Sequence, residues 1–194
     1  EPRFRAKLRL EITHNREYQA VSSLVPAVKE SIGPRLVRQI FHGSENQMPL
    51  HKLSFVVGRL SKLKYRINEQ SPTRVPASVW AHPSLLDQCL FALTNAKVAF
   101  DYVGKQDDSI IGTRKLDLVA VPGFSRKIMS GFGLSLVRQD LLALDPEDEL
   151  DKRMEIFEQM VKLSTKQHFG NKVSPKTWRD LWLVESIASE QEAV

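Results

Sequence analysis

The sequence lacks several features that define whole classes of protein. Its one cysteine, Cys89, excludes an internal disulfide and a CxxC zinc site. No apolar run reaches the roughly 18–20 residues that a helix needs to cross a bilayer. The chain opens at Glu1 without a basic-then-apolar leader, so we expect no signal peptide. Together these absences predict a protein that is not secreted and works in a reducing compartment.

Enzyme signatures are equally scarce. The sequence contains no G-x-G-x-x-G, G-x-x-x-x-G-K-[ST], H-E-x-x-H or G-x-S-x-G motif. No two of its five histidines stand four residues apart, so we expect no metal and no cofactor. Asp101 and Asp117, with Lys115 nearby, would make a metal-dependent nuclease if a hairpin brought them together. We keep this as a third hypothesis, and otherwise predict that the chain is not an enzyme and has no catalytic residues.

The composition is that of a globular protein with an uneven charge distribution. Of its 194 residues, 42% are hydrophobic and 26% are charged, which excludes a wholly disordered chain. Residues 1–75 hold 14 of the 28 Lys and Arg but 6 of the 23 Asp and Glu. This basic part predicts an anionic partner, either nucleic acid or an acidic membrane surface. A solvated face rich in arginine is the alternative interpretation.

Hydrophobic periodicity predicts both strands and helices. Alternation with period two predicts strands, the last two of which we expect to pair as a hairpin; they cover residues 3–12, 97–103 and 113–121. Helical spacing and capping signals predict helices over residues 18–32, 83–95, 145–170 and the stretch after Pro175. The segment between 122 and 133 is expected to be a loop.

These elements predict an α+β fold. We expect a central antiparallel sheet flanked by helices and a helical C-terminal third. The predicted domains are an α+β core over residues 1–143, which carries the basic strand face, and a helical extension over residues 144–194 that packs on the core.

A stripe of cations is the first candidate binding site. Along the expected strand 3–12, basic side chains recur at every second residue and therefore share one face. Each cation near an acidic leaflet contributes on the order of 1 kcal/mol, and phosphate contacts with nucleic acid would show the same salt dependence. The basic stripe continues onto the strands that we expect beside it, and it consists of Arg3, Arg5, Lys7, Arg9, Lys52, Lys62, Lys64 and Arg66.

A short apolar loop flanked by cations is the second candidate site. It runs from Val121 to Phe124 and is followed by Arg126 and Lys127. In this hypothesis Phe124 enters a lipid interface while the two cations meet headgroups. The alternative is that Val121 ends a buried strand and Phe124 caps the core.

Six short segments lie one after another along residues 4–137. They are the basic strand Phe4–Leu10, Asn15-Arg16, VPAV at 25–28, KLSFVVGRLSKLK at 52–64, the strand and acidic turn at 97–109, and FSRKIMSGFGLSLV at 124–137. Taken in this order, they resemble the matrix proteins of rhabdoviruses, nearest the vesiculovirus branch. The family's lysine-rich tail with its proline-tyrosine motif is absent, and the helical third has no counterpart.

The resemblance implies a non-enzymatic viral matrix protein. Such a protein self-associates, binds acidic phospholipid on the inner leaflet, and condenses ribonucleoprotein for assembly and budding. It would be found in the virion and the host cytoplasm, peripheral at the inner face of the membrane. Trp178 and Trp182 then become candidates for self-association. The alternative is an RNA-binding module that uses the same basic stripe without membrane affinity.

Overall fold

The computed structural model describes residues 2–43, 47–65, 75–106, 113–145, 147, 150–171 and 173–190. Ten strands and three α-helices lie in these ranges. The strands are β1 (Arg9–Asn15), β2 (Gln19–Ser22), β3 (Val25–Ile32), β4 (Leu36–His42), β5 (Phe55–Gly58), β6 (Ser61–Lys64), β7 (Ala77–Ala81), β8 (Leu116–Val121), β9 (Ile128–Ser130) and β10 (Leu134–Arg138). The helices are α1 (Leu90–Gln106), α2 (Leu150–His168) and α3 (Leu181–Glu190).

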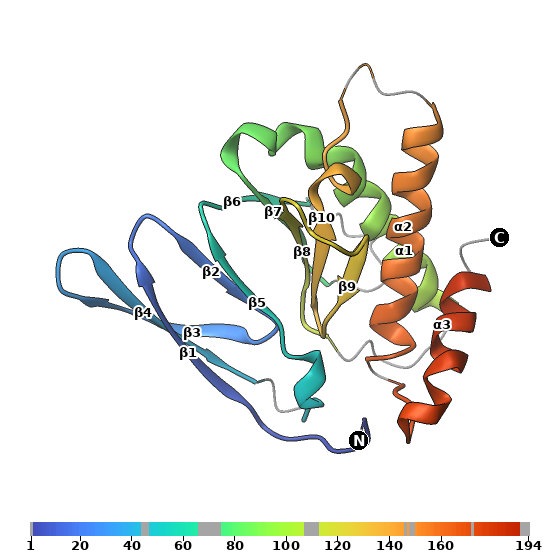
Figure 1. Ribbon diagram of the computed structural model, residues 1–194, viewed down its shortest axis with the longest axis horizontal. Helices are drawn as coiled ribbons and strands as arrows, with labels where there is room; N and C mark the ends of the chain where they lie inside the picture. The colour runs from blue at the N-terminus through green and yellow to red at the C-terminus, as the bar shows by residue number, and fades with distance from the viewer. Residues whose placement is uncertain are drawn as a thin grey trace.

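The described elements form layers around a five-stranded sheet (Figure 1). The sheet has the order β6-β7-β8-β10-β9, and α1 and α2 cover one of its faces. The ribbon β2-β5 packs against the other face through Val21, Val119, Leu134 and Leu136. A separate three-stranded sheet, β1-β4-β3, extends to one side. The predicted α+β class is confirmed.

The central sheet is mixed, and the expectation of an antiparallel sheet is wrong. β8 runs parallel to both β7 and β10, while β6 and β9 pair antiparallel at the edges. Parallel neighbours need a crossover connection, and α1 supplies it between β7 and β8. β9 falls within residues 122–133, which we expected to be a loop.

Residues 97–103 are helical, so the expected hairpin does not exist. They belong to α1, whose buried positions follow helical spacing. Phe100 is 2% exposed, whereas Val98 and Tyr102 are 54% and 58% exposed. The alternation that suggested a strand therefore reflects one buried residue between two exposed ones. The buried residues of α1 are Ala92, Leu93, Ala96, Lys97, Ala99, Phe100 and Val103.

The helix expected over residues 18–32 is wrong as well. That stretch forms β2 and β3, and β3 pairs antiparallel with β4 through a turn at Gly33, whose φ is 74°. Its β-branched residues are Val21, Val25, Val28 and Ile32, and such side chains favour a pleated strand over a helix. Pro26 is accommodated where the register shifts between Pro26 and Val28, as expected of proline in a strand.

Two helices follow residue 144. α2 packs on α1 and shares the main core through Ile156, Met160 and Leu163, each fully buried. Ser164 Oγ donates to the carbonyl of Ala96 at 3.0 Å and ties the two helices together. The division into domains at residue 143 stays a prediction. Within the described ranges, no helix has the length and apolarity that a bilayer crossing requires.

Candidate functional site

A pocket of about 230 Å³ lies where α2, α3, β9 and the 3₁₀ turn η1 (Leu50–Lys52) meet. We call it the α2–α3 pocket. Its polar lining is His51, Lys52, Arg126, Ser130, Lys166 and Glu185. Its apolar lining includes Ile128, Phe169, Trp178, Leu181 and Val184. The pocket thus combines several cations with one carboxylate on a largely apolar wall.

α2 and α3 place Lys166 and Glu185 opposite one another. Lys166 Nζ lies 2.7 Å from Glu185 Oε2, and the lysine side chain is 17% exposed. One helical turn along each helix, Lys162 Nζ lies 3.4 Å from Ser189 Oγ. Positions four apart share a helix face, so these two contacts form a ladder between antiparallel helices. Gly170, with φ of 116°, follows the last turn of α2 and redirects the chain toward α3.

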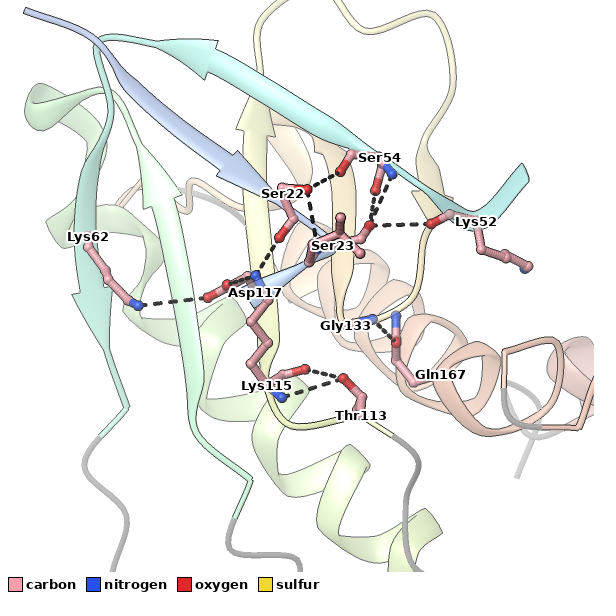
Figure 2. A network of polar contacts seen from close by, with 11 residues as sticks. Ser22, Ser23, Lys52, Ser54, Lys62, Thr113, Lys115, Asp117, Gly133 and Gln167 are labelled. Atoms are coloured by element: carbon pink, nitrogen blue, oxygen red, sulfur yellow. Dashed lines mark hydrogen bonds and ion pairs between the residues drawn. The ribbon is translucent and has the colours of Figure 1, made fainter. Parts of the chain in front are cut away.

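Lys52 enters the pocket from η1. Its backbone carbonyl accepts a hydrogen bond from Ser23 Oγ at 3.3 Å, and Ser23 Oγ also pairs with Ser54 Oγ at 2.8 Å. Figure 2 shows its side chain leaving this network on the side away from Asp117. Burial, followed by the nearby ammonium of Lys166, lowers the pKa of Lys52, and Glu185 partly offsets this effect. Keeping the Lys52 side chain protonated therefore costs free energy unless an anion lies close to it.

His51 and Trp178 form an aromatic wall beside the cations. Their ring centroids are 4.8 Å apart with an interplanar angle of 65°, an edge-to-face arrangement that aromatic rings favour. Burial, followed by the charge of Lys52, lowers the pKa of His51. The ring is therefore neutral at pH 7 and offers a flat polar surface without adding charge.

Gln167 fixes the β9 side of the pocket to α2. Its Nε2 has three acceptors within 3.1 Å, the carbonyl of Gly131 and the hydroxyls of Ser130 and Ser135, which share its two N–H donors. Its Oε1 accepts from the backbone N–H of Gly133 at 2.9 Å (Figure 2) and from Asn171 Nδ2 at 3.0 Å. A buried amide with this many partners holds β9 and β10 in one position.

Gly131 allows η1 to approach the β9–β10 turn. A Cβ on this residue would meet Ser54 Oγ and would lie 3.0 Å from the carbonyl oxygen of Lys52 and 2.9 Å from that of Leu134. Backbone oxygens cannot rotate away, so the Gly131→Ala variant must displace η1 and Lys52. We expect it to lower the free energy of unfolding by about 2 kcal/mol, as overpacking of a tight site does.

The matched control is Gly58→Ala in β5, where the nearest atom to a new Cβ is Leu60 Cγ at 3.7 Å. Urea unfolding followed by circular dichroism measures both variants. An equal, small change in the two would show that the close approach at Gly131 has no energetic importance.

The basic stripe is divided between two sheets. Arg9 lies in β1, Arg3, Arg5 and Lys7 precede that strand, and Lys62 and Lys64 lie in β6 of the five-stranded sheet. β1 and β6 are therefore not neighbours, contrary to the expectation. Arg9 pairs with Glu11 at 2.5 Å, and Arg5 donates to Ser174 Oγ at 2.7 Å. Lys52 lies in the α2–α3 pocket, and Arg66 lies outside the described residues.

The residues of the expected membrane loop have separate environments. Val121 and Phe124 are half-buried against the core beneath β2-β5. Lys127 pairs with Glu155 of α2 at 3.0 Å, and Arg126 lines the α2–α3 pocket. Of the two tryptophans that we proposed for self-association, Trp178 lines the pocket, while Trp182 is exposed on α3.

The acidic residues of the nuclease hypothesis do not converge. Asp117 is buried in β8, where Lys115 Nζ lies 2.9 Å and Lys62 Nζ 4.0 Å from its carboxylate (Figure 2). Asp101 lies on α1 and pairs with Lys97. Each carboxylate is thus neutralised by lysine in a different part of the fold, and Asp117 serves to hold the sheet to the β2-β5 ribbon.

Comparison with known proteins decides the family. Residues 91–194, more than half of the chain, match the peptidase family M1 domain. This chain belongs to peptidase family M1. Human glutamyl aminopeptidase is 30% identical over 97% of the chain, and rat aminopeptidase N is 27% identical over 99%. Aminopeptidase A of Gloydius brevicauda is 28% identical over 97%. The chain spans about a fifth of the length of these relatives.

M1 membership overturns the predicted function. The chain is not a rhabdovirus matrix protein, and the prediction that it is not an enzyme is wrong because its family consists of peptidases. The proposed partners (acidic membrane, ribonucleoprotein and a second copy) and the virion location fail with it, as do the RNA-binding and nuclease alternatives. The resemblance was built from short basic and apolar segments, which recur by chance in many β-rich proteins.

The family implies a zinc ion, and the residues present do not fit one. Zincin-type peptidases hold zinc with two histidines four residues apart on a helix, together with a further ligand such as glutamate. In this M1 chain, the pair four apart on α2 that faces Glu185 and Ser189 is Lys162 and Lys166. Protonated amines repel a cation, and within the described ranges no group of three His, Cys, Asp or Glu side chains is placed to hold a metal.

The sequence analysis missed Lys166 and Glu185. A signal was available, because Lys162 and Lys166 stand four apart on the helix that we expected over residues 145–170. A metal-site motif on a helix requires histidine at this spacing, so it points neither to the lysines nor to the acidic residue on the helix that follows.

Proposed function

We propose that the protein binds peptides, in keeping with the names of its aminopeptidase relatives. The end of the peptide binds in the α2–α3 pocket of this chain. The observation that carries the proposal is the position of the pocket. Most of its lining lies within residues 126–185, inside the part of the chain that matches the M1 domain. The remaining lining residues, His51 and Lys52, come from η1.

The chemistry of the pocket supports peptide binding. Trp178 and its apolar neighbours offer a surface for a side chain, while Lys166 and Glu185 offer charged groups for the polar ends of a peptide. Its volume of about 230 Å³ is below the roughly 300–1,000 Å³ of drug-sized sites, which suits a terminal residue. We assign no bond-breaking step to these residues, because they do not fit the zinc ion that such a step requires in the zincin peptidases.

Replacing Trp178 tests this assignment. In calorimetric titrations of the full-length protein with tripeptide amides that begin with Ala, Glu or Lys, we expect saturable binding of at least one peptide. The Trp178→Ala variant should lower its affinity about tenfold or more, because a large aromatic contact at the centre of a site carries much of the binding free energy.

The control is Trp182→Ala, which removes a tryptophan four residues along the chain that is 66% exposed and does not line the pocket. It should bind the same peptide as the unmodified protein does. An absence of binding to every peptide would refute the proposed function, and equal losses in both variants would place the peptide elsewhere.

A further inference from the structure

The α2–α3 pocket carries an excess of positive charge. Lys52, Lys166 and Arg126 face one carboxylate among its lining residues, that of Glu185. His51 adds no negative charge. The excess positive charge of the lining would therefore stabilise a ligand that carries a negative charge.

Lys52 differs from the other two cations of the pocket, because Lys166 pairs with Glu185 and Arg126 is exposed to water. Within the described part of the chain, the Lys52 ammonium makes no hydrogen bond and no ion pair, although it is less exposed than a surface lysine. Its Nζ lies beside Gly170, where a Cβ would come within 3.7 Å of it. A half-buried ammonium loses part of its hydration, and Glu185 offsets this loss only in part.

Lys166 and Glu185 already form an ion pair inside the pocket. The ammonium of Lys166 occupies the space beside the Glu185 carboxylate that a cation would need, at an N–O distance of 2.7 Å. The pair leaves one face of the Lys166 ammonium for a second acceptor, since an ammonium has three donors. An anion held by both Lys52 and Lys166 would satisfy each of them.

Resting on the proposed function, we propose that the α2–α3 pocket binds a carboxylate of the peptide directly on the ammonium groups of Lys52 and Lys166, without a bridging metal ion. The carboxylate is either an acidic side chain or the C-terminal group of the peptide. Both sources present the same two oxygens, and charge-assisted hydrogen bonds to lysine are short and strong.

The test compares three peptides in the presence of EDTA, with the full-length protein. Glu-Ala-Ala amide has a side-chain carboxylate, Gln-Ala-Ala free acid has a C-terminal one, and Gln-Ala-Ala amide has neither. We expect one of the first two to bind about tenfold more tightly than the third. The Lys52→Met variant should remove this preference while still binding Gln-Ala-Ala amide, and Lys166→Met provides a second, independent variant.

The control for net charge is Lys64→Met, which removes an exposed lysine of β6 far from the pocket lining. It should keep the preference. Equal binding of all three peptides, or a preference that survives Lys52→Met and Lys166→Met, would overturn this inference while leaving peptide binding intact. Binding that requires added zinc would overturn the metal-free part, whereas no binding of any peptide would refute the proposed function itself.

Discussion

The Asp117→Asn variant is expected to lose about 3 kcal/mol of the free energy of unfolding. The Asp117 side chain is 6% exposed and lies between two lysines, Lys115 at 2.9 Å and Lys62 at 4.0 Å. Lys115 also donates to the carbonyl of Ser22, so it links β8 to β2. An amide in place of the carboxylate leaves two ammonium groups close together without their shared anion.

Thermal and urea unfolding of the full-length protein measure this loss. The control is Glu17→Gln, which breaks an ion pair between Glu17 and Arg59 whose side chains are 70% and 67% exposed. Its effect should be much smaller, because ion pairs in water contribute little. If the two variants lost the same stability, Asp117 would not hold the two layers together.

The Gln167→Met variant is expected to lose a similar amount, about 3 kcal/mol, and to disturb the pocket as well. Methionine has a similar length but cannot make the hydrogen bonds by which the Gln167 amide contacts five partners in the core. The N–H of Gly133 and the side chain of Asn171 would lose this acceptor while remaining buried. Each buried polar group left unpaired costs about 1–3 kcal/mol.

Peptide titration at a temperature where the variant is folded separates the two effects. We expect its affinity for peptide to fall, because β9 carries Ile128 and Ser130 into the pocket. Gln19→Met is the control, since Gln19 makes one long hydrogen bond of 3.4 Å to Lys29 at the surface. Unchanged stability and affinity in Gln167→Met would show that the amide is not what positions β9.

The sequence predicts the fold class but not the order of the strands. Alternation at residues 116–121 indicates β8, and the Asp145 start signal indicates the helix α2, which begins at Leu150. α1 was misread because small alanines on its buried face give little hydrophobic contrast, whereas Phe100 beside Val98 and Tyr102 imitates a strand. Tertiary packing against α2 overrides that local pattern.

The candidate site is harder to predict, because its residues are far apart in the sequence. Lys52, Arg126 and Trp178 were each singled out for another role, and the fold brings all three to one pocket. Lys166 on α2 and Glu185 on α3 form an ion pair between two helices, and no local sequence motif in this chain predicts that contact. Standard metal-site spacings are defined for histidine, so they do not point to Lys162 and Lys166, which stand four residues apart on α2.

Hydrogen–deuterium exchange of the full-length protein, with and without a saturating peptide, tests the central claim most directly. The claim that the peptide binds in the α2–α3 pocket predicts slower exchange in residues 50–53, 128–131 and 166–185, which contribute to its lining. The three-stranded sheet of β1, β3 and β4 serves as an internal reference and should exchange at the same rate in both states. Protection confined to that sheet, with none around the pocket, would contradict the claim.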